Sequence, residues 1–244
     1  MFDAFADTKH SQAVLPVLPA VESWKEEELL SKEKSVLGFY VSGHPMERWR
    51  IDVEAISNLR LGEVDALRQG ETVRVAGIIS EMRTKIDKRG RTMAFATLED
   101  FTGRAECLIF ADAFERAGAA LHEDAIVVMI GRAESSGDSI RLFPTEIHGI
   151  EDAIKTMSKS VVISLSLDTT TSKHIYEMKR VLERYSGSGK CPCYFFVLDE
   201  RNATVGNGEW KLFSKKYRVE PSKDFLHQLR ATVGESAVRI SVDT

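Results

Sequence analysis

Basic side chains crowd one short stretch of the chain, between positions 83 and 91. This stretch holds five cations and one anion, Asp87, whereas residues 71–151 hold ten Lys or Arg and fourteen Asp or Glu. An acidic region that concentrates its positive charge in this way favours phosphate binding, and a nucleic-acid backbone is a leading candidate. The alternative is a solvated hairpin tip. The five cations are Arg83, Lys85, Lys88, Arg89 and Arg91.

Aromatic rings near the basic stretch offer the second requirement of single-strand binding. Bases stack on ring faces while cations follow the backbone, and each stack contributes about 1–3 kcal/mol. Strand alternation cannot put Phe95, Phe101 and Phe110 on one face, so at least one is in the core, and the alternative is that all three are. Arg104 could extend the basic track. The predicted DNA-binding residues are therefore Arg83, Lys85, Lys88, Arg89, Arg91, Phe95, Phe101 and Arg104.

Motifs for catalysis or metal binding are scarce. The sequence has no Gly-rich phosphate loop ending in Gly-Lys-Ser/Thr, no His-Glu-x-x-His and no Gly-x-Ser-x-Gly. The acidic pairs Glu99-Asp100 and Glu151-Asp152 lack the further carboxylate that two-metal phosphoryl transfer needs. Cys191-Pro-Cys193 has one residue between its thiols, unlike common zinc sites. We expect no catalytic residue, no metal site and no cofactor in this chain.

Composition narrows the class of protein further. The 244 residues suffice for one large domain or two small ones, and a net charge of −4 requires any nucleic-acid binding to be local. No apolar run approaches the ~20 residues of a membrane helix, and the N-terminus lacks a secretion signal. The odd number of cysteines, with apolar neighbours, suits reduced thiols in buried strands. We therefore expect a cytoplasmic protein with no membrane partner.

The elements around the basic stretch predict a small β-barrel. Alternation of inward and outward residues begins at Val73 and resumes on both sides of the turn at 100–103. A helix between the third and fourth strands distinguishes the order from a simple meander, and this is the order of the five-stranded OB-fold. We predict an OB-fold nucleic-acid-binding domain over residues 71–151. Its predicted elements are strands from 73, over 93–98, 104–110, 125–130 and 140–143, and a helix over 112–121.

A tail and a helical segment precede the predicted barrel, and an α+β domain follows it. Residues 1–22 predict a flexible tail, and residues 23–70 predict a helical segment that begins at a capping box of Ser23 and Glu26. Residues 160–244 predict a C-terminal α+β domain with the order βαββαβ. Within it we expect a flexible break at Ser186–Gly189 and a hairpin turn at Asn207-Gly208. The fold class is thus mixed: a helical segment, a barrel and an α+β domain.

Several stretches together resemble the C-terminal quarter of the alpha subunit of bacterial DNA polymerase III, the family C replicative polymerase. Residues 33–45, Glu-Lys-Ser-Val-Leu-Gly-Phe-Tyr-Val-Ser-Gly-His-Pro, resemble the family's signature after its polymerase core. Residues 161–244 resemble its tail domain more loosely. The barrel stretches that resemble the family's OB domain are Val75-Ala-Gly-Ile-Ile, Lys88-Arg-Gly-Arg-Thr-Met-Ala-Phe95, Leu98-Glu-Asp and Glu106-Cys-Leu-Ile-Phe110.

The resemblance implies a role in DNA replication, within the replisome. It implies single-stranded template DNA as the ligand of the barrel and the clamp-loader tau subunit as the partner of the tail domain. Sliding-clamp binding is implied through a motif of which Met1-Phe2 could be the last two residues, although its Gln is missing here. The family is a DNA-directed DNA polymerase, a nucleotidyltransferase, but no residue of this sequence matches its catalytic aspartates. We therefore expect the chain to be catalytically silent alone.

Two alternatives stay open at the level of the sequence. The barrel could be a protein-interaction module, because an acidic partner would suit the same basic hairpin. The chain could also be a stand-alone enzyme that acts on nucleic acid, such as a nuclease, and the missing carboxylate cluster argues against this.

Overall fold

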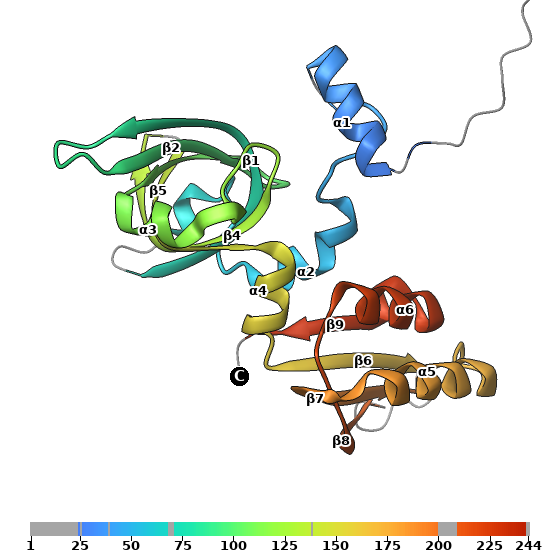
Figure 1. The fold of residues 1–244 in the computed structure, drawn as a ribbon. Coiled ribbons are helices and arrows are strands. Elements are labelled where there is room, and N and C mark those ends of the chain that lie inside the picture. Colours follow the sequence, from blue (N-terminus) through green and yellow to red (C-terminus); the bar gives the residue numbers. More distant parts are fainter. Residues whose placement is uncertain are drawn as a thin grey trace, which may run out of the picture. The chain divides into compact units, whose positions relative to one another are not determined.

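The computed structural model describes residues 24, 26–38, 40–67, 71–137, 139–199 and 209–242 (Figure 1). The predicted tail 1–22, Ser23 of the capping box and the turn at Asn207-Gly208 lie outside these residues. The chain divides into two compact units, and the division falls after Pro45. The domain boundaries expected from the sequence stay predictions.

The first unit contains helix α1 (Glu26–Leu37) and the turn that follows it. Gly38 ends the helix with φ +81°, a left-handed conformation that glycine adopts without strain, and its N–H donates to Lys34 O at 2.9 Å. The Glu33 carboxylate accepts the N–H groups of Val41 (2.8 Å) and Ser42 (2.9 Å) and the Ser42 hydroxyl. The Ser42 hydroxyl is the largest cause of a lowered pKa of Glu33, followed by the two backbone donors. Glu33 therefore holds the following turn against its own helix.

The second unit begins with short helical pieces. They are a 3₁₀ turn (Glu47–Trp49), helix α2 (Arg50–Ile56) and another 3₁₀ turn (Val64–Ala66). Leu59 and Leu61, between these pieces, join the core of the barrel that follows.

Five strands then form a closed barrel in the order β1-β2-β3-β5-β4. The long strand β1 pairs with two neighbours. Thr72–Ile78 pairs with β4, and the part from Ile78 onward, with a bulge between Ile79 and Glu81, pairs with β2. The parallel pairing of β3 with β5 closes the ring. The predicted OB-fold is confirmed. The elements are β1 (Thr72–Ile86), β2 (Thr92–Glu99), β3 (Arg104–Ile109), α3 (Ala111–Ala117), β4 (Ile126–Ser136) and β5 (Ser139–Gly149).

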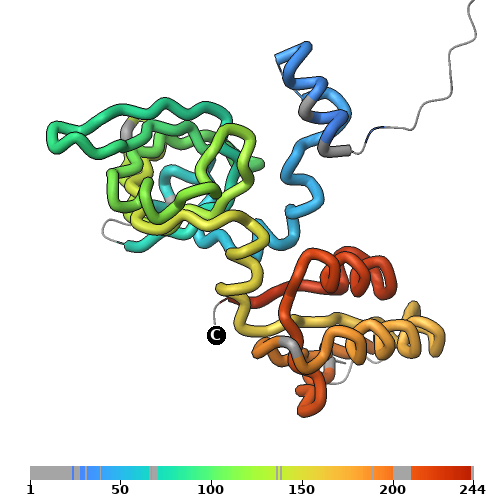
Figure 2. Tube along the Cα trace, in the orientation of Figure 1, coloured from blue at the N-terminus to red at the C-terminus, as the bar shows by residue number. Residues whose placement is uncertain are grey.

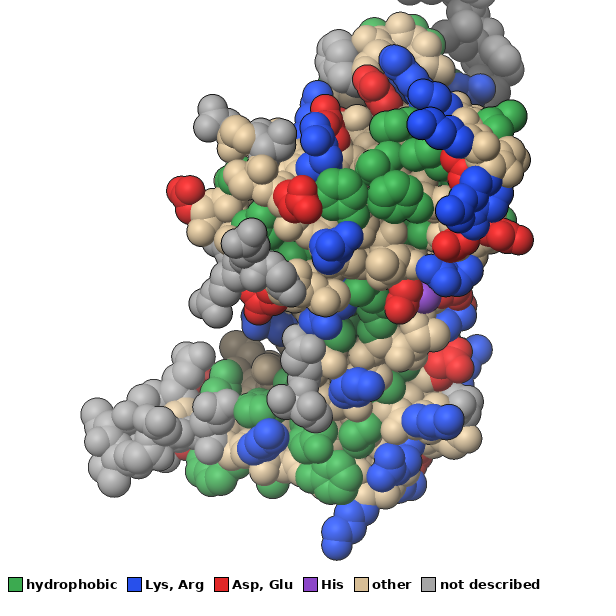
Figure 3. Space-filling model, turned by 90° about the vertical axis from the view of Figure 1, so that its left-hand side faces the viewer, with side chains coloured by type: hydrophobic (Ala, Val, Ile, Leu, Met, Phe, Trp, Pro, Cys, Tyr) green, Lys and Arg blue, Asp and Glu red, His purple; other side chains and the backbone are tan. Residues whose placement is uncertain are grey.

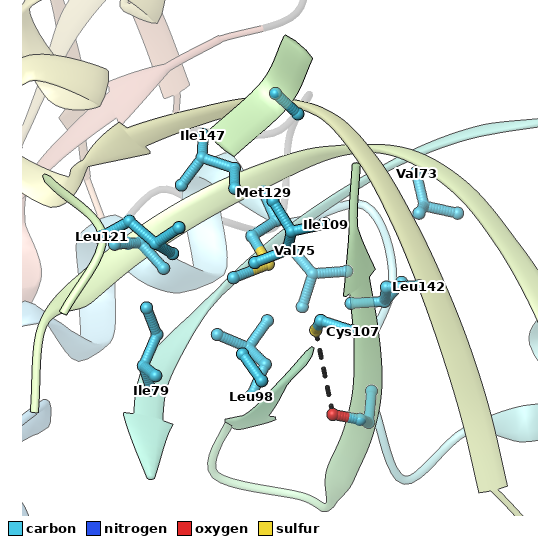
Figure 4. Close-up of a cluster of buried hydrophobic side chains, with 14 of the residues drawn as sticks. Val73, Val75, Ile79, Leu98, Cys107, Ile109, Leu121, Met129, Leu142 and Ile147 are labelled. Carbon is cyan, nitrogen blue, oxygen red and sulfur yellow. Dashed lines mark hydrogen bonds between the residues drawn. The ribbon is translucent and has the colours of Figure 1, made fainter. Parts of the chain in front are cut away.

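The barrel interior is an apolar core built from alternate strand positions (Figure 4). On β2 the fully or nearly buried residues are Ala94, Ala96 and Leu98, so Phe95 and Thr97 between them face outward. Cys107 is also inside, and its thiol lies 3.8 Å from Ala105 O. Burial raises the pKa of this thiol to about 12, which keeps it neutral and unreactive.

The C-terminal part is a four-stranded mixed sheet of order β8-β7-β6-β9 with helices α5 and α6. Strand β5 runs directly into helix α4 (Ile150–Met157), an element that the sequence analysis missed (Figure 2). The expected break at 186–189 is wrong, because β7 begins at Ser186. Gly189 lets the backbone approach β8, because a Cβ at this position would overlap the backbone of Val219. The elements are β6 (Ser160–Ser166), α5 (Ser172–Tyr185), β7 (Ser186–Leu198), β8 (Glu209–Val219), α6 (Lys223–Val233) and β9 (Val238–Ser241).

A buried ion pair joins α2 to α6. The Arg230 guanidinium donates to both carboxylate oxygens of Asp52, at 2.8 and 2.6 Å, and also to Val238 O at 3.3 Å. The Asp52 side chain is fully buried, and 6% of the Arg230 side chain is exposed. Such a bidentate, further hydrogen-bonded pair offsets its desolvation cost only while both partners are present. Within the described part of the chain, no helix combines the length and apolar character needed to cross a bilayer.

Candidate nucleic-acid interface

The solvent-facing side of the barrel strands β1, β2, β3 and β5 brings together residues that are far apart in sequence. Phe95 on β2 pairs in register with Arg83 on β1 and with Leu108 on β3. The neighbouring row runs from Thr97 through Glu106 to Arg141 of β5. These side chains face outward because their neighbours along each strand fill the core.

The face is hollowed into an open groove with a cavity volume of about 430 Å³. Phe95, with 48% of its surface exposed, and Phe143 give the groove aromatic character, while Arg83 and Arg141 give it positive charge. Figure 3 shows one side of the molecule, on which hydrophobic side chains lie between basic and acidic ones. The groove is lined by Glu81, Met82, Arg83, Phe95, Ala96, Thr97, Glu106, Cys107, Leu108, Arg141 and Phe143.

The tip of the β1–β2 hairpin is organised by one carboxylate. Asp87 Oδ1 accepts the N–H groups of Arg89 (2.8 Å) and Arg91 (2.9 Å), and Gly90 takes φ +79° to close the turn. The backbone hydrogen bond from Arg91 is the largest cause of a lowered pKa of Asp87. The tip is thus a defined turn that presents the exposed side chains of Lys88 and Arg89 to solvent.

The predicted cations divide into two groups. Arg91 contacts Asp112 at 2.6 Å and Asp87 at 3.5 Å, and Arg104 contacts Glu99 at 2.9 Å. These exposed pairs are weak and salt-sensitive, so a phosphate can compete for either guanidinium. The cations that form no ion pair with any described residue are Arg83, Lys85, Lys88 and Arg89.

The predicted aromatic residues do not form one cluster, and the expectation that at least one of them is in the core is wrong, because none of the three is buried. Phe95 lines the groove, whereas Phe101 lies in the β2–β3 turn, where the Arg50 guanidinium stacks 3.9 Å from its ring centroid. Phe110 is half exposed at the N-cap of α3, next to β3 but not among the groove residues. The roles of the eight predicted residues in DNA binding stay predictions, and the structure brings only Arg83 and Phe95 of them into the groove.

Sequence reasoning missed the contribution of β5 and the acidic groups of the groove. Arg141 and Phe143 alternate with buried Ile140 and Leu142, a pattern visible in the sequence, but their place beside β3 depends on barrel closure. Glu106 Oε2 accepts from Arg141 Nη2 at 2.9 Å and from Nε at 3.3 Å. The groove therefore carries its own counter-charges.

The acidic pairs considered for catalysis have structural partners. Asp100 Oδ1 accepts the N–H groups of Thr102 (2.6 Å) and Gly103 (2.8 Å), and its Oδ2 accepts the Leu61 N–H at 2.8 Å. Glu151 and Asp152 lie in the first turn of α4, where negative charge complements the helix dipole. These carboxylates stabilise turns and helix ends.

Comparison with known families agrees with this geometry. Residues 73–150 match the OB-fold nucleic acid binding domain. The match covers the OB domain from β1 to the start of α4, the part of the chain that contains the hairpin and the groove.

Beyond the OB domain, the chain is similar to DNA polymerase III subunit alpha of several bacteria. The Escherichia coli (strain K12) protein is 25% identical over 226 residues, 91% of this chain and 19% of that protein. The Pseudomonas aeruginosa protein is 30% identical over 213 residues, 86% and 17% respectively. The Neisseria meningitidis serogroup B protein is 27% identical over 248 residues, 99% and 20% respectively. The chain thus spans about a fifth of the length of these relatives.

Proposed function

We propose that this chain acts as the C-terminal part of a replicative DNA polymerase III alpha subunit and that its OB domain binds single-stranded template DNA. Similarity to that subunit along most of the chain supports the family, and the match of 73–150 supports a nucleic acid as ligand. Nucleotidyl transfer would belong to the whole polymerase, because no residue here is assigned to catalysis.

The observation that carries the proposal is the placement of Phe95 in the groove, one strand from Arg83. An exposed ring lets a base stack, and a cation on the adjacent strand lies within reach of the backbone of the same strand of DNA. Lys85, Lys88 and Arg89 continue the positive charge from the groove to the hairpin tip. Arg141 supplies a cation at the opposite wall.

The test is single-strand affinity measured against salt concentration. Replacing Arg83, Lys85 and Lys88 together by Gln removes three cations that have no described ion-pair partner. Each lost phosphate contact should lower the salt slope by about 0.7, so the triple variant should lose about 2 units of slope and bind much more weakly. Replacing Lys155, Lys173 and Lys179 of helices α4 and α5 by Gln removes the same charge elsewhere and should change the slope little. Equal effects of the two triple variants would show that the chain binds DNA only through net charge.

A second candidate function, a protein-interaction module, is favoured by one observation. Glu81 and Glu106 place negative charge inside the groove, which suits a partner of mixed charge better than a polyanion. Competition separates the two functions, because an oligonucleotide should displace a protein partner only if both occupy the groove. No displacement, together with no DNA affinity of the purified chain, would favour the protein module.

The remaining roles implied by the family belong to the same proposal. The C-terminal domain would contact the clamp-loader tau subunit, and the sliding clamp would bind near Met1-Phe2, which lies outside the described residues. Binding of purified tau to the full chain tests the first of these roles, and cross-links from tau confined to residues before 160 would contradict it.

A further inference from the structure

Strand β8 has an unusual composition that the proposed function does not use. Its eleven residues, Glu209–Val219, contain four cations and three aromatic residues but one acid. Cations interleaved with aromatic rings are the combination that single-stranded nucleic acids require. The cations are Lys211, Lys215, Lys216 and Arg218, and the aromatic residues are Trp210, Phe213 and Tyr217.

Helices α5 and α6 pack against each other on one side of the C-terminal sheet β8-β7-β6-β9. Tyr185 of α5 packs against Phe225 of α6 with 5.4 Å between ring centroids, and Gln228 donates to the Tyr185 hydroxyl at 2.9 Å. Val161 and Ile163 of β6 are fully buried beneath these helices, and Val162 between them faces the other way. We call that other side the outer face.

Strand register defines which side chains share the outer face. Val162 pairs with Tyr194 of β7 and with Arg239 of β9, and Tyr194 pairs with Phe213 of β8. One row further, Phe196 pairs with Lys211. Among the described side chains of these rows, there are three aromatic rings and two cations, and none is a carboxylate.

The contacts on the outer face confirm this arrangement. The rings of Tyr194 and Phe213 are 5.2 Å apart at 49°, and Lys211 Nζ lies 5.1 Å from the Tyr194 ring and 5.5 Å from the Phe196 ring. Phe213 is 48% exposed, and the side chains of Lys211 and Arg239 are exposed. The rings are therefore adjacent, partly open to solvent and accompanied by exposed cationic side chains.

We propose that the outer face of the C-terminal sheet is a second binding surface for single-stranded nucleic acid, separate from the groove of the OB domain. Phe213 and Tyr194 offer ring faces to bases, and Lys211 and Arg239 contact phosphates. The charge of this face favours a polyanion over a protein segment as the ligand. Lys211 and Arg239 have no described carboxylate in their rows, so they attract phosphates and repel basic partners. This surface goes beyond the proposed function, which assigns DNA binding to the barrel.

The test compares two matched double variants of the full chain. Lys211→Gln with Phe213→Ala removes one cation and one exposed ring from the outer face. Lys173→Gln with Tyr176→Ala does the same on α5, where Tyr176 is 65% exposed. The probe is a fluorescent oligo-dT of about 12 nucleotides, within the usual range for one binding fold. The outer-face variant should bind about tenfold more weakly and lose about 0.7 units of salt slope, while the α5 variant should bind like the parent chain.

The same measurements in a second background separate this proposal from the one above. In a chain that also carries Arg83→Gln and Phe95→Ala, the remaining affinity should come from the outer face and should fall when the outer-face changes are added. If the barrel changes have no effect but the outer-face changes do, the proposed function of the groove fails and the outer face stands. If the outer-face changes have no effect in either background, the outer face is overturned.

Two further measurements distinguish a loss of binding from a loss of folding. Lys211→Gln alone removes no packed ring, so it should lower the salt slope while leaving the unfolding midpoint unchanged. An oligonucleotide carrying 5-iododeoxyuridine should form photo-cross-links in peptides of β7 or β8. Cross-links confined to barrel peptides, or a concentration-dependent dimer that Phe213→Ala dissociates, would contradict the proposal.

Discussion

The barrel groove and the outer face of the C-terminal sheet both combine rings with cations, but they balance charge differently. In the groove, Arg141 is held by Glu106 at 2.9 Å, and Glu81 lies nearby. On the outer face, Lys211 lies over two aromatic rings and no described carboxylate shares its rows. The groove thus pairs one of its two cations, Arg141, and leaves Arg83 without a described ion-pair partner, whereas on the outer face no described carboxylate pairs with Lys211 or Arg239.

This difference predicts different kinds of binding. A groove with internal ion pairs must exchange a carboxylate for a phosphate, so its gain comes mainly from stacking and from the hairpin cations outside it. A face whose described cations have no carboxylate in their rows gains more from each phosphate, and its binding should fall more steeply with salt. The comparison assumes that both surfaces rest on one folded unit.

The largest expected effect tests that assumption. Asp52→Ala leaves the buried Arg230 guanidinium without its counter-ion, and we expect a loss of about 3–5 kcal/mol in the free energy of unfolding, measured by urea denaturation. Lys173→Ala, which breaks an exposed pair with Glu177 at 3.9 Å, should change it by less than about 0.5 kcal/mol.

A second variant shows whether the loss comes from the unpaired charge. Asp52→Leu combined with Arg230→Met replaces the pair by apolar side chains and should recover most of the stability lost in Asp52→Ala. A loss below about 1 kcal/mol in Asp52→Ala would mean that the folding of the unit does not depend on the ion pair between α2 and α6.

The next effect concerns stacking in the groove. Phe95→Ala should weaken single-strand binding by about 5- to 100-fold, because one base loses its ring. Phe110→Ala is a matched control, since Phe110 is 50% exposed against 48% for Phe95 but does not line the groove. Fluorescence anisotropy with oligo-dT measures both. Similar losses in the two variants would show that the Phe95 ring in the groove contributes no more to binding than the Phe110 ring outside it.

The sequence predicts this molecule best where periodicity is strong. The barrel strands, α5 over Ser172–Tyr185 and the burial of alternate residues on β2 follow from patterns of two and of 3.6 residues. Both Thr171 and Ser172 are residue types that cap helices, and the N-cap of α5 is Thr171, because its hydroxyl accepts the His174 N–H. Such one-residue differences depend on local geometry that composition does not reveal.

What the sequence could not predict depends on long-range pairing. The segment 186–189 is part of a strand that lies beside β8, and the close approach of the Val219 backbone requires a glycine at position 189. Arg141 reaches the groove because β5 pairs with β3 across the barrel closure, 35 positions from Glu106. The pairing of Asp52 with Arg230 spans 178 positions, and nothing local to either residue indicates it.

A smaller effect tests the charge balance of the groove directly. Glu106→Gln removes the carboxylate that holds Arg141, so single-strand binding should become about two- to fivefold tighter and its salt slope should rise by about 0.7. Glu115→Gln, an exposed change on α3, controls for net charge. Weaker binding by Glu106→Gln would mean that Glu106 itself contributes to binding the nucleic acid and does not compete with it for Arg141.

The smallest expected effect concerns the hairpin tip and its dependence on pH. The Asp87 carboxylate accepts the N–H groups of Arg89 and Arg91, and these hydrogen bonds lower its pKa, so the tip should keep its turn at neutral pH and lose it only as pH falls through that lowered pKa. NMR chemical shifts of the Arg89 and Arg91 amides should therefore change below the usual range of an aspartate, and Asp87→Asn should remove the transition. Asp87→Asn should also weaken DNA binding less than twofold, because the turn orders the cations of the tip without adding charge. A transition at the ordinary pKa of aspartate would show that the tip is not held by Asp87, and the cations at 88 and 89 would then bind as a flexible loop.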